Sequence, residues 1–192
     1  MTRFADDFVM VFENHDDCRR VEEVLPKRFQ RYKLTLHPEK TRCVDFRFDH
    51  RKDNRSSGIP ATFDFLGFTH FWGVSRKGNN VVYQKTAKGR ISRTLKAFND
   101  YCRKSRHRPP NEQYAGLNRK LRGHYAYFGI TGNAKALGMI HHKVKGIWHK
   151  WLCRRSQKSR ITWDKFHLFL ERFPLLPPKI HHQYYRYQPA NQ

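Results

Sequence analysis

The spacing of the apolar residues changes near Lys88-Gly89, and this change limits the folds that the chain can adopt. Before it, short apolar and aromatic runs such as residues 8–12 and 63–72 stand between polar and turn-forming residues, which is typical of β-strands. After it, apolar residues recur at helical spacing. We therefore predict an α+β fold, with antiparallel strands and one helix in residues 1–86, a basic helical bundle in 87–175 and a basic, aromatic tail in 176–192.

The residue pattern of the first half, residues 1–86, predicts a strand, a helix, a second strand and a hairpin, in that order. Residues 2–5 and 8–12 are expected to form a hairpin with Asp6-Asp7 as its turn, and the continuous apolar run of 8–12 indicates a strand buried on both faces. A helix is predicted over residues 16–32, with Asn14 or Asp16 as its N-cap. Pro26 predicts a kink or a break in it, because an interior proline costs about 3 kcal/mol. Residues 47–61 indicate a surface loop, and 63–72 and 81–84 indicate strands joined by a turn at 77–80.

The second half predicts helices separated by proline and glycine signals. The expected inward-facing residues are Ile91, Leu95, Phe98 and Cys102 in the first helix, Tyr114, Leu117, Leu121, Tyr125 and Phe128 in the second, and Ile140, Val144, Ile147 and Trp151 in the third. Gly129 and Gly132 should end the second helix, and Asn133 can cap the third. Thr162 can cap a fourth helix over residues 163–173, which Pro174 stops.

Charge is distributed unevenly along the chain. Lys and Arg number 39 against 16 Asp and Glu, and residues 87–192 alone hold 23 basic and 4 acidic side chains. An excess of this size indicates a polyanionic partner. The candidate RNA-binding residues are Arg93, Lys96, Arg103 and Lys104, opposite the apolar stripe of the first helix, and Arg119, Lys120 and Arg122. For any single one of them, a solvated surface position is an equally good interpretation.

Cysteine spacing and hydropathy indicate the cellular compartment in which the protein works. The four cysteines are far apart and contain no C-x-x-C pair, so free thiols in a reducing cytosol are the simplest interpretation. No apolar run approaches the roughly 18 residues that span a bilayer. We expect a soluble, cytoplasmic protein without a membrane partner.

Two adjacent carboxylates, Asp6 and Asp7, interrupt an apolar run near the start of the chain. Successive side chains of a strand point to opposite faces, so both can face one ligand only at a turn or bulge. Exposed there, they could bind Mg²⁺ beside phosphates. An ordinary hairpin turn, in which Asp is common, is the alternative.

Four blocks resemble a known family. R-F-A-D-D-F-V at 3–9 resembles the Tyr/Phe-Ala-Asp-Asp box of reverse transcriptases encoded by group II introns, and L-T-L-H-P-E-K-T at 34–41 and F-D-F-L-G-F at 63–68 resemble the next two blocks of those proteins. L-N-R-K-L-R-G at 117–123, with Tyr125 and Phe128-Gly129, resembles their maturase-specific domain. The chain is identified by this resemblance as the C-terminal part of a group II intron reverse transcriptase and maturase.

The resemblance implies a partial polymerase palm followed by a thumb and maturase bundle. Asp6 would be a metal ligand for Mg²⁺ and Asp7 a second or supporting carboxylate, while Phe4 would line the nucleotide or the primer terminus. Lys40 would stabilise or protonate the leaving group, although a solvated loop lysine remains the alternative.

Residues 65–68 would form the hairpin that grips the primer end. Phe65, Leu66 and Gly67 would contact the primer, with Gly67 allowing close backbone approach. For the two phenylalanines of this segment, a place in a core strand is the alternative.

The resemblance also implies partners and a missing part. The bundle would hold structured intron RNA and a primer–template duplex. The family's first catalytic aspartate and its fingers precede the Asp-Asp box, so we expect no polymerase activity unless an upstream fragment supplies them. A non-catalytic, RNA-binding maturase remnant is the second hypothesis, and an unrelated basic nucleic-acid-binding protein the third.

The second half also contains aromatic residues and histidine pairs that could contact RNA or a metal ion directly. Tyr125, Trp148 and Trp151 are expected in the core, whereas Tyr184, Tyr185 and Tyr187 are candidates for stacking on bases. The His141-His142 and His181-His182 pairs lack nearby Cys or acidic residues, so metal binding there is not favoured.

Overall fold

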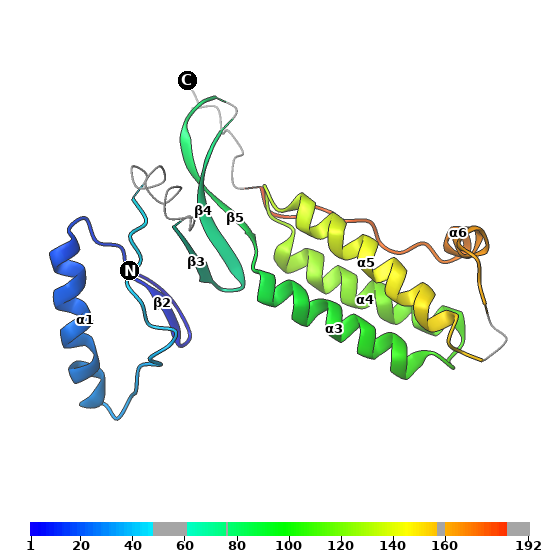
Figure 1. Ribbon diagram of the computed structural model, residues 1–192, viewed down its shortest axis with the longest axis horizontal. Helices are drawn as coiled ribbons and strands as arrows, with labels where there is room; N and C mark the ends of the chain where they lie inside the picture. Colours follow the sequence, from blue (N-terminus) through cyan, green and yellow to red (C-terminus); the bar gives the residue numbers. More distant parts are fainter. Residues whose placement is uncertain (48–60, 76, 157–159, 184–192) are drawn as a thin grey trace, which may run out of the picture. The chain divides into compact units, whose positions relative to one another are not determined.

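A computed structural model describes residues 1–47, 61–75, 77–156 and 160–183. The chain divides into two compact units, Met1–Tyr83 and Gln84–Gln192. Antiparallel strands lie in the first unit and four of the described helices in the second (Figure 1). The predicted α+β class is confirmed. The predicted loop at 47–61 falls almost wholly outside the described residues, as do Tyr184, Tyr185 and Tyr187.

The chain begins with an antiparallel hairpin of β1 (Thr2–Phe4) and β2 (Asp7–Val9). The closing pair is Phe4 with Asp7, so the turn is Ala5-Asp6 and the predicted Asp6-Asp7 turn is wrong by one residue. Ala5 takes a left-handed backbone conformation (φ 49°), and the Arg3 Nε donates to its carbonyl at 2.9 Å. The predicted strand over residues 8–12, buried on both faces, is wrong: β2 ends at Val9, none of its three residues is buried, and Val11 beyond it is 86% exposed.

Helix α1 (His15–Gln30) follows with Asn14 at its N-cap position. It continues through Pro26, so no break occurs there. Pro26 is exposed, which leaves the carbonyl that loses its helical hydrogen bond within reach of water. Phe29 of α1 stacks on Phe8 of β2 with ring centroids 6.1 Å apart, which joins the helix to the hairpin.

A three-stranded sheet has the order β3 (Thr62–Phe65), β4 (Phe68–Val74), β5 (Asn80–Thr86). The run 63–72 is therefore two strands and not one, because Leu66 (φ 50°) and Gly67 (φ 81°) make a two-residue turn between Phe65 and Phe68. Positive φ at both central residues is what a tight hairpin turn of this kind requires. The hairpin that the family resemblance implied at 65–68 is present.

All four cysteines are free thiols, and two of them lie side by side in the first unit. The Cys18 and Cys43 sulfurs are 2.6 Å apart, between α1 and the irregular segment that follows it. The hydrogen bond with Cys43 and then burial raise the pKa of Cys18 to about 11. Spacing alone does not suggest this pair, since 25 residues separate the two cysteines.

The second unit contains α3 (Lys88–Ser105), α4 (Pro110–Phe128), α5 (Ala134–Leu152) and α6 (Trp163–Arg172). Helices α3, α4 and α5 run side by side (Figure 1). Their buried apolar residues include Phe98, Cys102, Leu117, Leu121, Tyr125, Phe128, Leu137, Ile140, Val144, Trp148 and Leu152. The α3 and α4 stripes are close to those predicted. On α5 the prediction is wrong in part, since Ile147 and Trp151 are only half-buried whereas Leu137, Trp148 and Leu152 are buried.

Buried side chains form the junctions of this bundle. Asn133 stands at the N-cap position of α5 but does not cap it with its side chain. Its Nδ2 donates to the Thr86 hydroxyl and to the Phe128 carbonyl, both at 2.8 Å, and its Oδ1 accepts from the Thr86 N–H at 3.0 Å. Thr162 does cap α6 as predicted, accepting from the Lys165 N–H at 3.4 Å. Asn133 therefore ties the end of β5 to the α4–α5 connection.

A second buried junction involves Trp148, whose ring is fully buried. Its Nε1 donates to the Gln113 Oε1 at 2.9 Å, and the Gln113 amide donates to the Arg108 carbonyl at 2.8 Å. The core interpretation of Trp148 and Tyr125 is confirmed, because both are fully buried. Trp151 is half-buried and donates to Asn99 of α3 at 2.9 Å.

Candidate nucleic-acid interface

The carboxylates of the first hairpin are exposed. Asp6 lies in the turn and Asp7 opens β2, beside Phe4, which is 65% exposed. Lys40 lies in a separate turn in which its own N–H donates to the His37 carbonyl at 3.2 Å. Among the described residues, no ion pair joins Lys40 to either aspartate, and no three His, Cys, Asp or Glu side chains gather in a way that could hold a metal ion.

The expected primer-contacting residues form one local structure. Phe65 ends β3, and Leu66 and Gly67 are the turn that follows. All three are half-buried. The turn is fixed by its strand pairs, Phe65 with Phe68 and Asp64 with Thr69.

The seven candidate RNA-binding cations occupy exposed positions on two neighbouring helices. Arg93, Lys96, Arg103 and Lys104 lie on α3, and Arg119, Lys120 and Arg122 lie on α4. None of the seven forms an ion pair with a carboxylate in the described part of the chain. Their charge is therefore available to an external anion.

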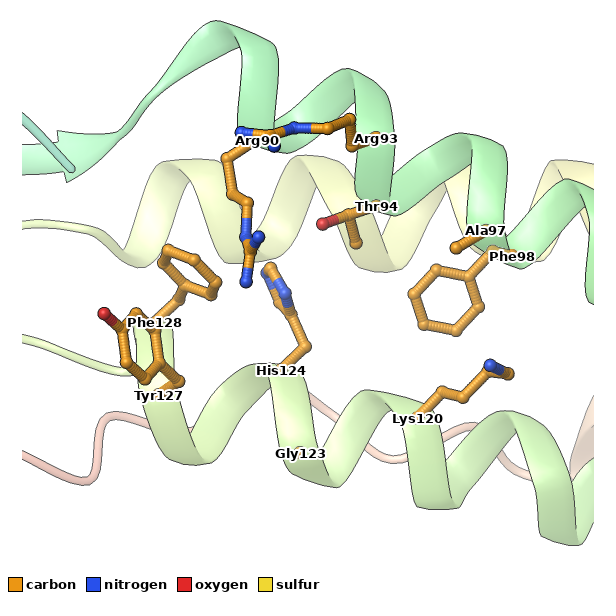
Figure 2. A pocket seen from close by; sticks show the side chains of 10 residues that line it. All are labelled: Arg90, Arg93, Thr94, Ala97, Phe98, Lys120, Gly123, His124, Tyr127 and Phe128. Atoms are coloured by element: carbon orange, nitrogen blue, oxygen red, sulfur yellow. The ribbon is translucent and has the colours of Figure 1, made fainter. Parts of the chain in front are cut away.

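A pocket of about 460 Å³ lies between α3 and α4 (Figure 2). Arg90, Arg93 and Thr94 line it from α3, and Lys120, Gly123 and His124 line it from α4. Ala97, Phe98, Tyr127 and Phe128 complete the lining, and none of the lining residues is acidic. The pocket therefore combines three cations with an apolar, aromatic wall.

The pocket cations are held by weak, local contacts. The Arg90 guanidinium lies 5.7 Å from the centre of the Phe128 ring, and the Lys120 ammonium 5.4 Å from that of Tyr101. The Arg93 Nε donates to the Gly89 carbonyl of its own helix at 3.3 Å. These cation–aromatic contacts orient the charges without neutralising them.

His124 is the buried titratable group of this pocket. It is 8% exposed, and its ring projects from α4 toward Arg90 (Figure 2). Burial and then the Arg90 charge lower the pKa of His124 to about 4. The ring is therefore neutral at neutral pH, and its Nε2 is buried without a hydrogen-bond partner in the structure.

Part of this pocket is predictable from the sequence. Arg93 and Lys120 were among the candidate residues, but Arg90 and His124 were missed. The signal was available as spacing: Arg90 precedes Arg93 by one helical turn and His124 follows Lys120 by one turn, so each pair shares a helix face. That the two faces are opposite one another depends on how α3 packs against α4.

Comparison of the chain with protein-family models, with curated proteins and with solved structures finds no match. Among the described residues, no helix has the length and the apolar character needed to cross a membrane.

Proposed function

We propose that this chain is the C-terminal part of a group II intron-encoded reverse transcriptase and maturase, and that its helical unit binds structured intron RNA. The observation that carries the proposal is a folded helical bundle in a basic part of the chain. Residues 87–192 hold 23 basic and only 4 acidic side chains. Cations on one exposed face of α3 and on the neighbouring α4 can follow an RNA backbone.

The first unit supports the polymerase ancestry. The R-F-A-D-D segment forms a hairpin with exposed carboxylates, and the F-L-G-F segment forms a second tight hairpin. In this proposal the first would be part of a two-metal centre with Mg²⁺, and the second would hold the primer end. A primer–template duplex is then the second nucleic-acid partner.

RNA binding is tested by its dependence on salt. The full chain should bind a structured intron RNA with an affinity that falls steeply as salt rises, because each phosphate contact adds about 0.9 to the slope of log K against log salt. Lys96→Gln combined with Lys104→Gln should lower that slope by about 2. Lys165→Gln combined with Lys179→Gln removes the same charge from outside α3 and α4 and should leave the slope nearly unchanged. Equal effects of the two pairs, or no binding by the unaltered chain, would contradict the proposal.

Catalysis needs a separate test. We expect the chain alone to give no Mg²⁺-dependent primer extension, and extension to appear when a fragment with the family's fingers and first aspartate is added. Extension by the chain alone that Asp6→Ala abolishes would overturn the first expectation. Tight RNA binding without extension by the combined fragments would instead favour the non-catalytic maturase remnant.

A further inference from the structure

We propose that the pocket between α3 and α4 takes one unpaired nucleotide of the bound RNA, with its phosphate on Arg90 and Arg93 and the edge of its base against the Nε2 of His124. This inference rests on the proposed RNA binding and adds a recognition site to it. The pocket lies wholly within the second unit.

The rim of the pocket selects an anion. Arg90 and Arg93 extend from one turn of α3, and Lys120 extends from α4 on the opposite side (Figure 2). No carboxylate lines the pocket, and none of the three cations forms an ion pair among the described residues. Guanidinium groups bind phosphate oxygens with two parallel hydrogen bonds, which makes them well suited to a phosphodiester.

The interior of the pocket suits a polar, planar ligand group. The Nε2 of His124 is buried without a partner, although the ring is 8% exposed and projects into the pocket (Figure 2). A buried polar atom without a hydrogen bond is costly, so it marks a position at which a ligand atom gains a bond. The edge of a nucleobase carries both donors and acceptors, and either form of the neutral imidazole can be satisfied.

The volume and the wall favour a single nucleotide over an intact duplex. About 460 Å³ falls within the range of small-ligand pockets. Phe98 and Phe128 are buried beneath the wall, and the exposed apolar surface of the lining comes from Ala97 and from Tyr127, which is 50% exposed. Bases leave the stack to lie against such aromatic surfaces in single-stranded RNA, so Tyr127 is the ring on which the base would lie. The exposed cations outside the pocket, such as Lys96 and Lys104, remain available for the flanking backbone.

Gly123 provides a way to fill the pocket without changing charge. A Cβ added at Gly123 meets no atom within 4 Å, because the residue borders the open pocket. By contrast, a Cβ at Gly116 of the same helix would collide with the Tyr101 side chain, so that glycine is required by packing. Glycine destabilises the interior of a helix and leucine favours it, so Gly123→Leu should not weaken α4.

The test uses the full chain and three RNA hairpins that share the same stem and loop sequence. The first carries a single bulged nucleotide, the second has the bulged position abasic, and the third is fully paired. We expect the bulged RNA to bind about fivefold or more tightly than the abasic one, since stacking of one base contributes at least this much. The abasic RNA separates recognition of the base from recognition of phosphate alone.

Gly123→Leu should remove the preference for the bulged RNA while leaving binding of the paired RNA and its salt dependence unchanged. The control is Gly138→Leu on α5, where a Cβ also meets nothing within 4 Å but the residue does not line the pocket. The control should keep the preference. Preference retained by Gly123→Leu, or equal binding of bulged and abasic RNA by the unaltered chain, would overturn the inference.

His124→Phe provides a second route if Gly123→Leu does not fold. It keeps a ring in the same space and removes both nitrogens, so the preference for the bulged RNA should fall without loss of paired-RNA binding. A preference that survives this change would also overturn the inference. Failure of the unaltered chain to bind any of the three RNAs would overturn the proposed function itself, and the pocket assignment with it.

Discussion

His124 illustrates how a single residue acquires its properties from packing. Its helix is predictable from the spacing of apolar residues, but its burial depends on Phe128 of α4, 4.7 Å away between ring centres, and on Arg90 of α3. A histidine in an exposed helix would titrate near its ordinary pKa of about 6.5. Burial beside a cation lowers the pKa to about 4, and only the folded chain has this arrangement.

The free energy of unfolding of the chain should depend on pH between pH 6.5 and 4. The folded pKa of His124 is depressed, so the unfolded chain takes up a proton in this range that the folded chain does not, and stability falls as pH drops. The loss should approach about 2 kcal/mol below pH 4, a value reduced from the full shift because the ring borders an open pocket.

Urea unfolding at pH 7 and pH 4 measures this loss. His124→Phe should make the free energy of unfolding less dependent on pH, although His141 retains a pKa that burial lowers and will keep part of the dependence. Leu168→Phe on α6 offers a control, because it changes an exposed side chain and removes no titratable group, and it should leave the pH dependence as it is. An unchanged pH dependence in His124→Phe would show that the ring does not titrate as described.

For the helices and strands, the sequence pattern predicted the kind of element better than the position of its turn or its buried face. The hairpin at the start of the chain was predicted, but its turn lies one residue earlier, because the backbone of Ala5 accepts a left-handed conformation that sequence statistics assign to glycine or asparagine. Likewise, α5 was predicted with its apolar face centred one residue away from the observed one. The α5 helix carries apolar residues on a broad arc, and only the packing of α3 and α4 decides which of them are buried.

Asn133 shows that the sequence also predicts a residue at the end of a helix without predicting its contacts. The sequence predicts it as a cap for α5, since asparagine favours that position. In the structure its side chain is 1% exposed and satisfies three backbone and side-chain groups of β5 and α4 instead.

Asn133→Ala should lower the free energy of unfolding by about 3 kcal/mol, because the Thr86 N–H, the Thr86 hydroxyl and the Phe128 carbonyl lose their buried partner. Thermal or urea unfolding provides the measurement. Asn111→Ala removes the same side chain from an exposed position on α4 and should change stability by less than about 0.5 kcal/mol. Similar losses in both variants would show that the Asn133 network does not stabilise the fold.

At the scale of the whole molecule, charge and compactness divide the chain at nearly the same place. Residues 1–86 hold 16 basic and 12 acidic side chains, against 23 and 4 in residues 87–192. The compact units divide between Tyr83 and Gln84. The core of α3, α4 and α5, the Asn133 junction and the candidate pocket all belong to the second unit.

We expect the second unit to carry RNA binding alone. A fragment of residues 84–192 should fold, with the helical circular dichroism of α3 to α6, because its buried residues contact one another. Its binding to the RNA used for the full chain should show nearly the same salt dependence, since the nearly balanced first unit adds little net charge. A folded fragment with about half the slope of the full chain would assign phosphate contacts to the first unit as well.

The α+β class, the positions of the helices, the Thr162 cap and the exposed cations of α3 and α4 can be read from the sequence, because they depend on local spacing and on capping preference. The contact of Cys18 with Cys43, the role of Asn133 and the approach of His124 on α4 to Arg90 on α3 follow from packing and not from local pattern. Those features depend on which residues distant in the chain become neighbours. The physical reason is that helical and strand periodicity fix the face on which a side chain lies, whereas its partner, its burial and its pKa are fixed by the element that packs against that face.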